Sequence, residues 1–115
     1  MAVQQWSDDT LVVKLTDDPV LSEEMAEVNA LIRGACCDIV LDMSDLTLLT
    51  SSGISKLLRL RKHMLEEGRT LILCSPQDRV WGVFLAMGLD GLFAFAENVT
   101  EALTRLQSDK GGRPH

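Results

Sequence analysis

The chain has 115 residues, a mass of 12.7 kDa, 46% hydrophobic residues and a formal net charge of −6. This length predicts a single domain, and the apolar fraction is sufficient for a hydrophobic core. The acidic balance argues against nucleic acid or an anionic membrane as a partner, because both require a basic surface. No apolar run approaches the roughly 18 residues of a membrane span, and no signal-peptide pattern opens the chain. We therefore expect a cytoplasmic protein without direct membrane insertion.

The cysteines and histidines do not predict a cofactor or metal site. Cys36 and Cys37 are adjacent in a set of three cysteines, which is not the pattern of a disulfide framework. His63 and His115 lie far apart, and neither has zinc-ligand spacing from a cysteine. We expect reduced thiols, no metal and no cofactor.

The first third of the chain predicts a hairpin and a helix. Residues 3–6 and 11–15 are short β-type runs separated by a polar, turn-rich cluster. Ser22 is a suitable N-cap for a helix that ends near Gly34. One face of this helix is apolar and consists of Met25, Val28, Leu31 and Ile32.

The middle of the chain predicts a buried strand, a connection and a long helix. Residues 39–41 form a β-branched apolar run, and Thr50, Ser51, Ser52 and Gly53 fall in the first turn of the following helix. Gly68 is expected to end this helix. The predicted core stripe of this helix is Ile54, Leu57, Leu58, Arg61, Met64 and Leu65.

The last third continues the alternation of strands and helices. Residues 70–74 predict a strand. Ser75 is the predicted N-cap of the next helix, Pro76 its first residue and Gly88 its end. A short strand at 92–95 and a capping box at 98–101 precede a closing helix. The predicted apolar positions of the last two helices are Val80, Val83, Phe84 and Met87, then Ala102, Leu103 and Leu106.

This alternation predicts an α/β fold: a mixed, mostly parallel β-sheet with an opening hairpin and about four helices. We expect one domain over residues 1–107 and a disordered tail at 108–115. Trp81 and Leu85 lie four residues apart, beside the predicted core stripe of their helix. They belong either to a wide buried face or to an apolar patch for a partner chain or a homodimer.

Two kinds of chemistry fit the sequence poorly. A receiver-type phosphoacceptor aspartate would need more than one helix between the acid pair Asp17–Asp18 and Asp42. A serine nucleophile at 51 or 52 would need a nearby base, whereas His63 lies about three turns further along the same helix. We therefore do not expect an enzyme.

The order of these segments resembles the STAS domain of anti-sigma factor antagonists. The resemblance is carried by residues 38–46, by Thr50-Ser51-Ser52-Gly53-Ile54, and by the segments 68–74, 75–76 and 87–89. It implies a STAS-type single domain. It also implies that Ser51 is phosphorylated by a partner anti-sigma factor that is a serine kinase, and that phosphorylation breaks the complex. Thr50, Ser52 and Gly53 would then belong to the binding surface.

The sequence departs from the family pattern at two places. Thr50 replaces the family's aspartate before the acceptor serine, so Thr50 is a second candidate acceptor. Residues 16–19 replace the family's loop after the second strand. The alternative function is therefore a non-phosphorylated STAS binding or scaffold subunit of a larger assembly, such as a transporter-associated or stress-signalling complex.

Overall fold

The structure is a computed structural model, and it describes residues 3–7, 10–17 and 37–111. The helix predicted between Ser22 and Gly34 lies outside the described residues, as do Cys36 and the last four positions of the predicted tail. The described strands are β1 (Val3–Ser7), β2 (Thr10–Lys14), β3 (Asp38–Asp42), β4 (Leu71–Cys74) and β5 (Ala94–Ala96). The described helices are α2 (Ser51–Glu66), α3 (Asp78–Ala86) and α4 (Val99–Gly111).

The strands form one sheet in the order β1-β2-β3-β4-β5. β1 pairs with β2 in antiparallel fashion, and every other neighbouring pair is parallel. The register aligns Leu11 with Ile39 and Ile39 with Leu71, so apolar side chains of adjacent strands share one face. The predicted mixed sheet with an opening hairpin is confirmed.

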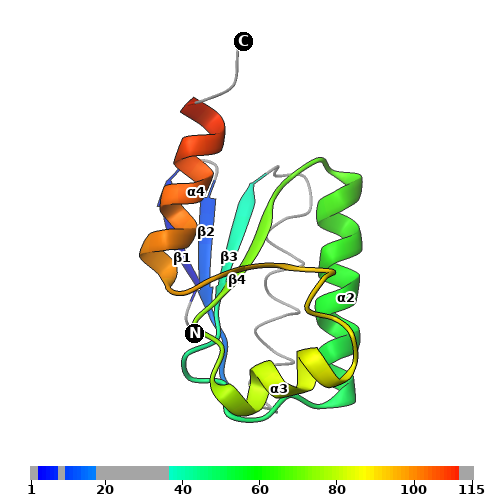
Figure 1. Ribbon diagram of the computed structural model, residues 1–115. Coiled ribbons are helices and arrows are strands. Elements are labelled where there is room, and N and C mark those ends of the chain that lie inside the picture. The colour runs from blue at the N-terminus through cyan, green and yellow to red at the C-terminus, as the bar shows by residue number, and fades with distance from the viewer. Residues whose placement is uncertain (1–2, 8–9, 18–36, 112–115) are drawn as a thin grey trace.

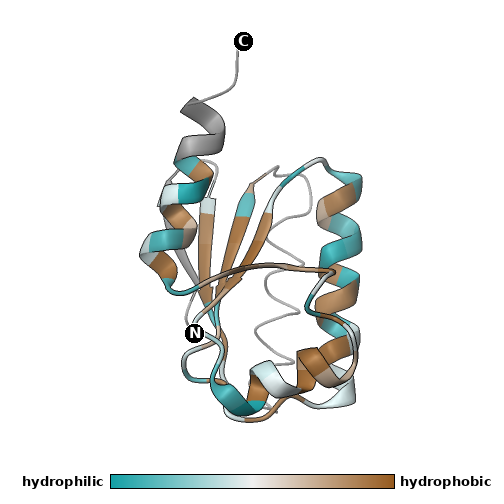
Figure 2. Ribbon diagram, in the orientation of Figure 1, coloured by the Kyte–Doolittle hydropathy of each residue, from teal (hydrophilic) through white to brown (hydrophobic). Residues whose placement is uncertain are grey.

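Helices cover both faces of the sheet. α2 and α3 lie on one face and α4 on the other (Figure 1). The larger core cluster lies on the α2 and α3 side and includes Val13, Leu41 and Phe84, whereas Val40 and Ile72 pack with α4. The central strands are therefore apolar along most of their length, as Figure 2 shows, which is typical of strands buried on both faces.

The buried face of α2 differs from the predicted stripe. Its buried residues are Gly53, Ile54, Leu57, Leu60 and Met64, and Leu60 is completely buried. Leu65, which we placed in the stripe, is 61% exposed. Positions 53, 57, 60 and 64 follow the 3.6-residue period closely, which places position 65 at the edge of this face. The predicted inclusion of Leu65 is wrong, and Leu60 was missed.

Glycine ends both α2 and α3, as predicted. Gly68 has φ 68° and Gly88 has φ 69°. After α3, the N–H of Gly88 donates to the carbonyl oxygen of Leu85 (3.2 Å), and the N–H of Leu89 donates to that of Phe84 (2.8 Å). These two bonds form a Schellman motif, which requires a left-handed residue at the position of Gly88.

The start of α3 differs from the prediction. The helix begins at Asp78 and not at the predicted Pro76. Ser75 has a left-handed backbone (φ 57°), and its hydroxyl donates to the carbonyl oxygen of Glu97 at 3.1 Å. The side chain predicted to cap α3 therefore ties β4 to the segment after β5. Asn98 caps α4 as predicted, because its side chain accepts from the N–H of Glu101 at 2.8 Å. The Glu101 carboxylate accepts from the N–H of Glu97 at 3.3 Å, one residue before the position that a capping box uses.

Candidate functional site

The hydroxyl-rich segment lies at the edge of the sheet where the parallel strands end, at the first turn of α2 (Figure 1). Thr50 is the N-cap of this helix, with an extended backbone (φ −91°, ψ 164°). Its Oγ1 accepts a hydrogen bond from the N–H of Gly53 at 3.1 Å. A threonine hydroxyl in this position satisfies one of the unpaired N–H groups of the helix end.

The three hydroxyls of this turn have different surroundings. Thr50 is half-buried and serves as the cap, while Ser51 and Ser52 are exposed. The Ser52 hydroxyl accepts from the Lys56 ammonium at 2.6 Å. Within the described ranges, the Ser51 hydroxyl has no hydrogen-bond partner. Ser51 is therefore the hydroxyl most accessible to a second molecule.

The electrostatics of this turn favour a negative group. The N-terminus of a helix carries a partial positive charge from its aligned peptide dipoles. The first turn of α2 contains no acidic residue, and Lys56 adds a positive charge one turn further on. An anion attached at Ser51 would therefore meet a favourable local field.

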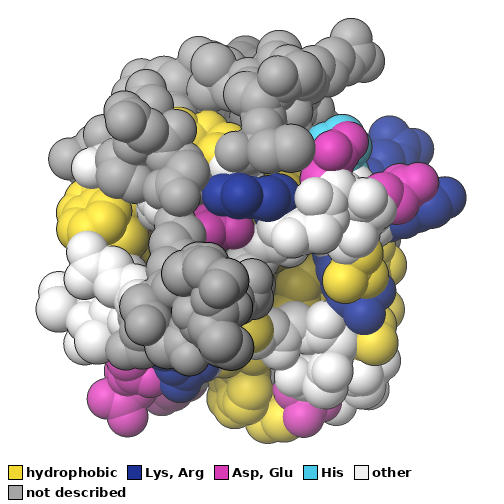
Figure 3. All heavy atoms as spheres, turned by 90° about the horizontal axis from the view of Figure 1, so that it is seen from above, with side chains coloured by type: hydrophobic (Ala, Val, Ile, Leu, Met, Phe, Trp, Pro, Cys, Tyr) yellow, Lys and Arg dark blue, Asp and Glu magenta, His cyan; other side chains and the backbone are white. Residues whose placement is uncertain are grey.

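The opposite end of the molecule, seen in Figure 3, has Lys and Arg side chains lying among Asp and Glu.

Asp17 holds the connection that leads into this turn. Its carboxylate accepts hydrogen bonds from the N–H groups of Thr47 (2.8 Å) and Leu48 (3.1 Å), and from the Thr47 hydroxyl. The hydrogen bond from the Thr47 hydroxyl, with help from the two N–H groups, lowers the pKa of Asp17. These bonds join the end of β2 to the β3–α2 connection.

Further contacts support the connection from the other side. The Gln77 side-chain amide donates to the carbonyl oxygen of Ser44 at 2.7 Å, and the Asp42 carboxylate accepts from the N–H of Ser44 at 3.0 Å. Leu46 and Leu49 are buried in the core, whereas Leu48 is 55% exposed. The site is thus a fixed surface loop followed by a fixed helix end. The sequence did not predict the contacts of Asp17 and Gln77. The one signal for Asp17 is that it follows β2, which ends at the same edge of the sheet as β3.

Trp81 and Leu85 lie one turn apart on α3 but differ in burial. Trp81 is half-buried and packs edge-on against Phe95, with ring centroids 4.8 Å apart, while Leu85 is 50% exposed. Val80 and Phe84 form the buried stripe as predicted, but Met87 is 56% exposed because it is the C-cap residue, where α3 turns away. The prediction of Met87 as a core residue is wrong.

Other kinds of site receive no support from the described residues. In those residues, no group of three or more His, Cys, Asp or Glu side chains is placed to hold a metal ion. Cys37 and Cys74 are buried, and burial raises the pKa of the Cys74 thiol to about 11. None of the helices in the described part of the chain is long and apolar enough to cross a membrane.

Several known structures have a similar fold, among them an anti-sigma factor antagonist and a stressosome chain. The chain is similar to the unphosphorylated anti-sigma factor antagonist SpoIIAA, with 22% identity and a TM-score of 0.79, covering 92% of this chain and 95% of that one. It is similar to an RsbS variant from Moorella thermoacetica, with 22% identity and a TM-score of 0.81 over 94% and 95%. A chain of the stressosome, described as a signal integration and transduction hub, matches with 23% identity and a TM-score of 0.77 over 94% and 97%.

The family comparison covers most of the sequence. The model of the STAS domain matches residues 3–102, which span every described strand and the first turn of α4. The match includes Thr50 to Gly53 and the connection that precedes them. The fold, with its opening hairpin, parallel strands and helix starting at a hydroxyl-rich turn, agrees with that assignment. The chain therefore belongs to the STAS domain family.

Proposed function

We propose that this protein is an anti-sigma factor antagonist-like regulator that binds a partner anti-sigma factor with serine kinase activity, and that phosphorylation of Ser51 switches this binding. The observation that carries the proposal is the exposed hydroxyl of Ser51 at the first position of α2, which has no hydrogen-bond partner among the described residues. In this proposal the protein is a cytoplasmic binding module and not an enzyme.

The physical basis of the switch is local charge. A phosphate on Ser51 adds about −1.5 to −2 charges at neutral pH. The helix end and Lys56 stabilise that charge within the free protein. In a complex, the same phosphate would lie in a contact surface, where desolvation and repulsion by acidic partner groups oppose binding. Phosphorylation therefore favours dissociation.

The geometry favours Ser51 over Thr50 as the acceptor. The Thr50 hydroxyl is half-buried and accepts the N–H of Gly53, so its modification would break the cap of α2. Modification of Ser51 leaves that hydrogen bond in place. Thr50 remains the second choice.

The proposed binding surface extends beyond the acceptor. Ser52 lies exposed beside the acceptor in the same turn, whereas Gly53 is buried and supports the turn from inside the helix. Exposed Leu48 in the preceding connection offers apolar area beside a polar turn. We place Leu85 and the accessible part of Trp81 in a second contact area on α3, for a partner protein or a second copy of this chain.

The test uses the intact chain expressed in its native cell. We expect mass spectrometry to find one phosphate, at Ser51, and co-purification to identify the kinase. By calorimetry with the purified kinase, Ser51→Asp should weaken binding at least tenfold, or about 1.4 kcal/mol, and Ser51→Ala should bind as the unmodified protein does.

Thr100→Asp is the matched control, because it adds the same charge at an exposed position of α4, on the other face of the sheet, and should bind the kinase like the unmodified protein. It should remain a substrate for phosphorylation at Ser51. The proposal fails if no phosphate is found and if Ser51→Asp and Ser51→Ala bind the captured partner equally.

The second candidate function is a constitutive STAS scaffold subunit of a larger assembly, transporter-associated or stress-signalling. Thr50 in place of an acidic residue favours it, as does the similarity in fold to a stressosome chain. In that case the protein would co-purify with a stable, stoichiometric assembly, and the phosphate would be absent.

A further inference from the structure

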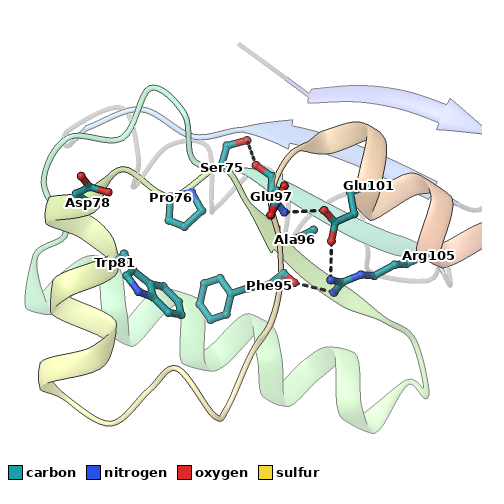
Figure 4. A pocket seen from close by; sticks show the side chains of 9 residues that line it. All are labelled: Ser75, Pro76, Asp78, Trp81, Phe95, Ala96, Glu97, Glu101 and Arg105. Carbon is teal, nitrogen blue, oxygen red and sulfur yellow. Dashed lines mark hydrogen bonds and ion pairs between the residues drawn. The ribbon is translucent and has the colours of Figure 1, made fainter.

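An open groove of about 670 Å³ lies between α3 and the start of α4, beside the edge strand β5 (Figure 4). Its lining comes from the segment before α3, from α3 itself, from β5 and from α4. It therefore lies between elements far apart in the sequence, and none of its lining residues belongs to the Thr50–Gly53 turn.

The lower wall of the groove in Figure 4 is apolar and aromatic. Trp81 and Phe95 meet edge to face at 83°, and Phe84 packs against the same Phe95 ring from the core at 5.2 Å. Phe95 is thereby held in place, and half-buried Trp81 keeps part of its ring accessible. The face of a tryptophan ring attracts a cation within about 6 Å.

The opposite rim of the groove is acidic. Asp78, Glu97 and Glu101 border it, and Arg105 is the single basic residue in the lining. The three carboxylates and one guanidinium give a formal balance of −2. Such a rim disfavours phosphate and carboxylate ligands and favours a cationic one.

Arg105 shows how a guanidinium is accommodated here. One of its nitrogens donates to the carbonyl oxygen of Phe95 at 2.7 Å, and another donates to the Glu101 carboxylate at 2.6 Å. This arrangement neutralises Glu101 at one end of the groove. Among the described residues, Asp78 and Glu97 have no ion-pair partner, so two carboxylates beside the aromatic wall remain available.

We propose that this groove docks an arginine-bearing segment of a partner protein. The guanidinium of that segment lies over the accessible part of the Trp81 ring, between the Asp78 end and the Glu97 end of the groove. Arginine fits better than lysine, because its planar group stacks on an aromatic ring and forms several hydrogen bonds at once. The proposal goes beyond the phosphoswitch and does not depend on it, because the groove residues do not include Ser51.

The test measures binding of the peptide acetyl-Gly-Arg-Gly-Arg-Gly-amide by the fluorescence of Trp81. Trp6 is exposed and would contribute background, so the full chain carries Trp6→Phe, which leaves Trp81 as the only tryptophan. We expect a saturable change in emission at low salt that weakens as salt rises. The same peptide with citrulline in place of arginine has nearly the same shape without the charge and should give no saturable change.

Charge variants assign the binding to the groove. The double variant Asp78→Asn with Glu97→Gln should weaken binding of the arginine peptide by about fivefold or more. The double variant Glu66→Gln with Asp90→Asn removes the same total charge at exposed positions outside the lining and should bind like the parent. Circular dichroism checks that each variant is folded, and Ser51→Asp should bind the peptide unchanged.

The proposal is overturned if the citrulline peptide binds equally well, or if the groove variant and its charge-matched control have the same affinity. It is also overturned if the chain self-associates without peptide and the double variant Asp78→Asn with Glu97→Gln abolishes that association, because the occupant would then be a second copy of this chain. A result in which Ser51→Asp weakens kinase binding but peptide binding fails would leave the phosphoswitch standing and remove only the groove proposal.

Discussion

Asp17 is the single side chain that most directly positions the loop before the candidate acceptor. It joins the end of β2 to Thr47 and Leu48, which are 30 and 31 residues away in the sequence. Its carboxylate accepts bonds from three donors in its ionised form. Because a charged acceptor with several donors is stabilised by the fold, the loss of this charge should loosen the connection.

We predict that Asp17→Asn lowers the free energy of unfolding at pH 7 by about 1 kcal/mol, a value reduced for the partial exposure of the site. The folded state lowers the pKa of Asp17, so its contribution is present above the ordinary aspartate pKa and is lost as pH falls through the lowered value. The difference between the two proteins should therefore shrink below about pH 4. Urea titrations at several pH values measure it.

Asp45→Asn is the control for this prediction. Asp45 lies in the same connection, but its ion pair with Lys14 is between two exposed side chains at 3.3 Å. Such a pair contributes little, so this variant should stay within about 0.5 kcal/mol of the parent. Equal effects of the two substitutions would contradict the anchoring role of Asp17.

Among the elements, α3 depends on a backbone conformation at each end. Ser75 before it and Gly88 after it have positive φ values, and only Gly88 has the residue type suited to that conformation. A Cβ added at Gly88 would meet nothing within 4 Å, so any cost of a side chain there is conformational and not steric crowding by neighbours.

We predict that Gly88→Ala destabilises the protein by about 1–2 kcal/mol, because alanine resists the left-handed conformation required by the Schellman motif. Gly82→Ala is the matched control. Gly82 lies within α3, is exposed and also has open space around its Cβ position. Alanine there should stabilise the helix by about 0.5–1 kcal/mol. Thermal unfolding distinguishes these opposite signs, and a shared sign would refute the interpretation.

At the scale of the whole molecule, stability depends on how α2 packs on the sheet. Leu60 is completely buried in the larger core cluster, together with side chains of β2, β3 and β4. The packing of Leu60 and its neighbours holds α2 on the sheet, and the first turn of this helix presents Ser51 at the surface.

At the other end of the sheet, buried Asp38 accepts the N–H of Thr70 and pairs with Arg69 at 3.2 Å, which fixes the entry to β4.

We predict that Leu60→Ala lowers the free energy of unfolding by about 2–5 kcal/mol, because it leaves a cavity beneath α2. Leu65→Ala removes the same atoms from an exposed position of the same helix and should change stability by less than about 0.5 kcal/mol. Chemical denaturation gives both values. Comparable losses would contradict the assignment of Leu60, and not Leu65, to the core.

Local sequence patterns were sufficient to predict much of the secondary structure of this protein. The opening hairpin, the strands at 38–42 and 71–74, the glycines that end α2 and α3, and the Asn98 cap of α4 were all predictable, because each depends on residues close together in the sequence. The hydroxyl-rich turn at the start of α2 was predictable for the same reason. Its role as a phosphoswitch remains a prediction.

Only the tertiary structure decided which side chains serve that turn. Ser75 reads as a helix cap in sequence, but contact with Glu97 from a distant segment holds it in another conformation. The bonds of Asp17 to the connection, the choice of Leu60 for the core and the packing of Trp81 on Phe95 likewise join residues far apart in the chain. Helical spacing leaves neighbouring positions nearly equivalent, and packing against the sheet determines which of them are buried.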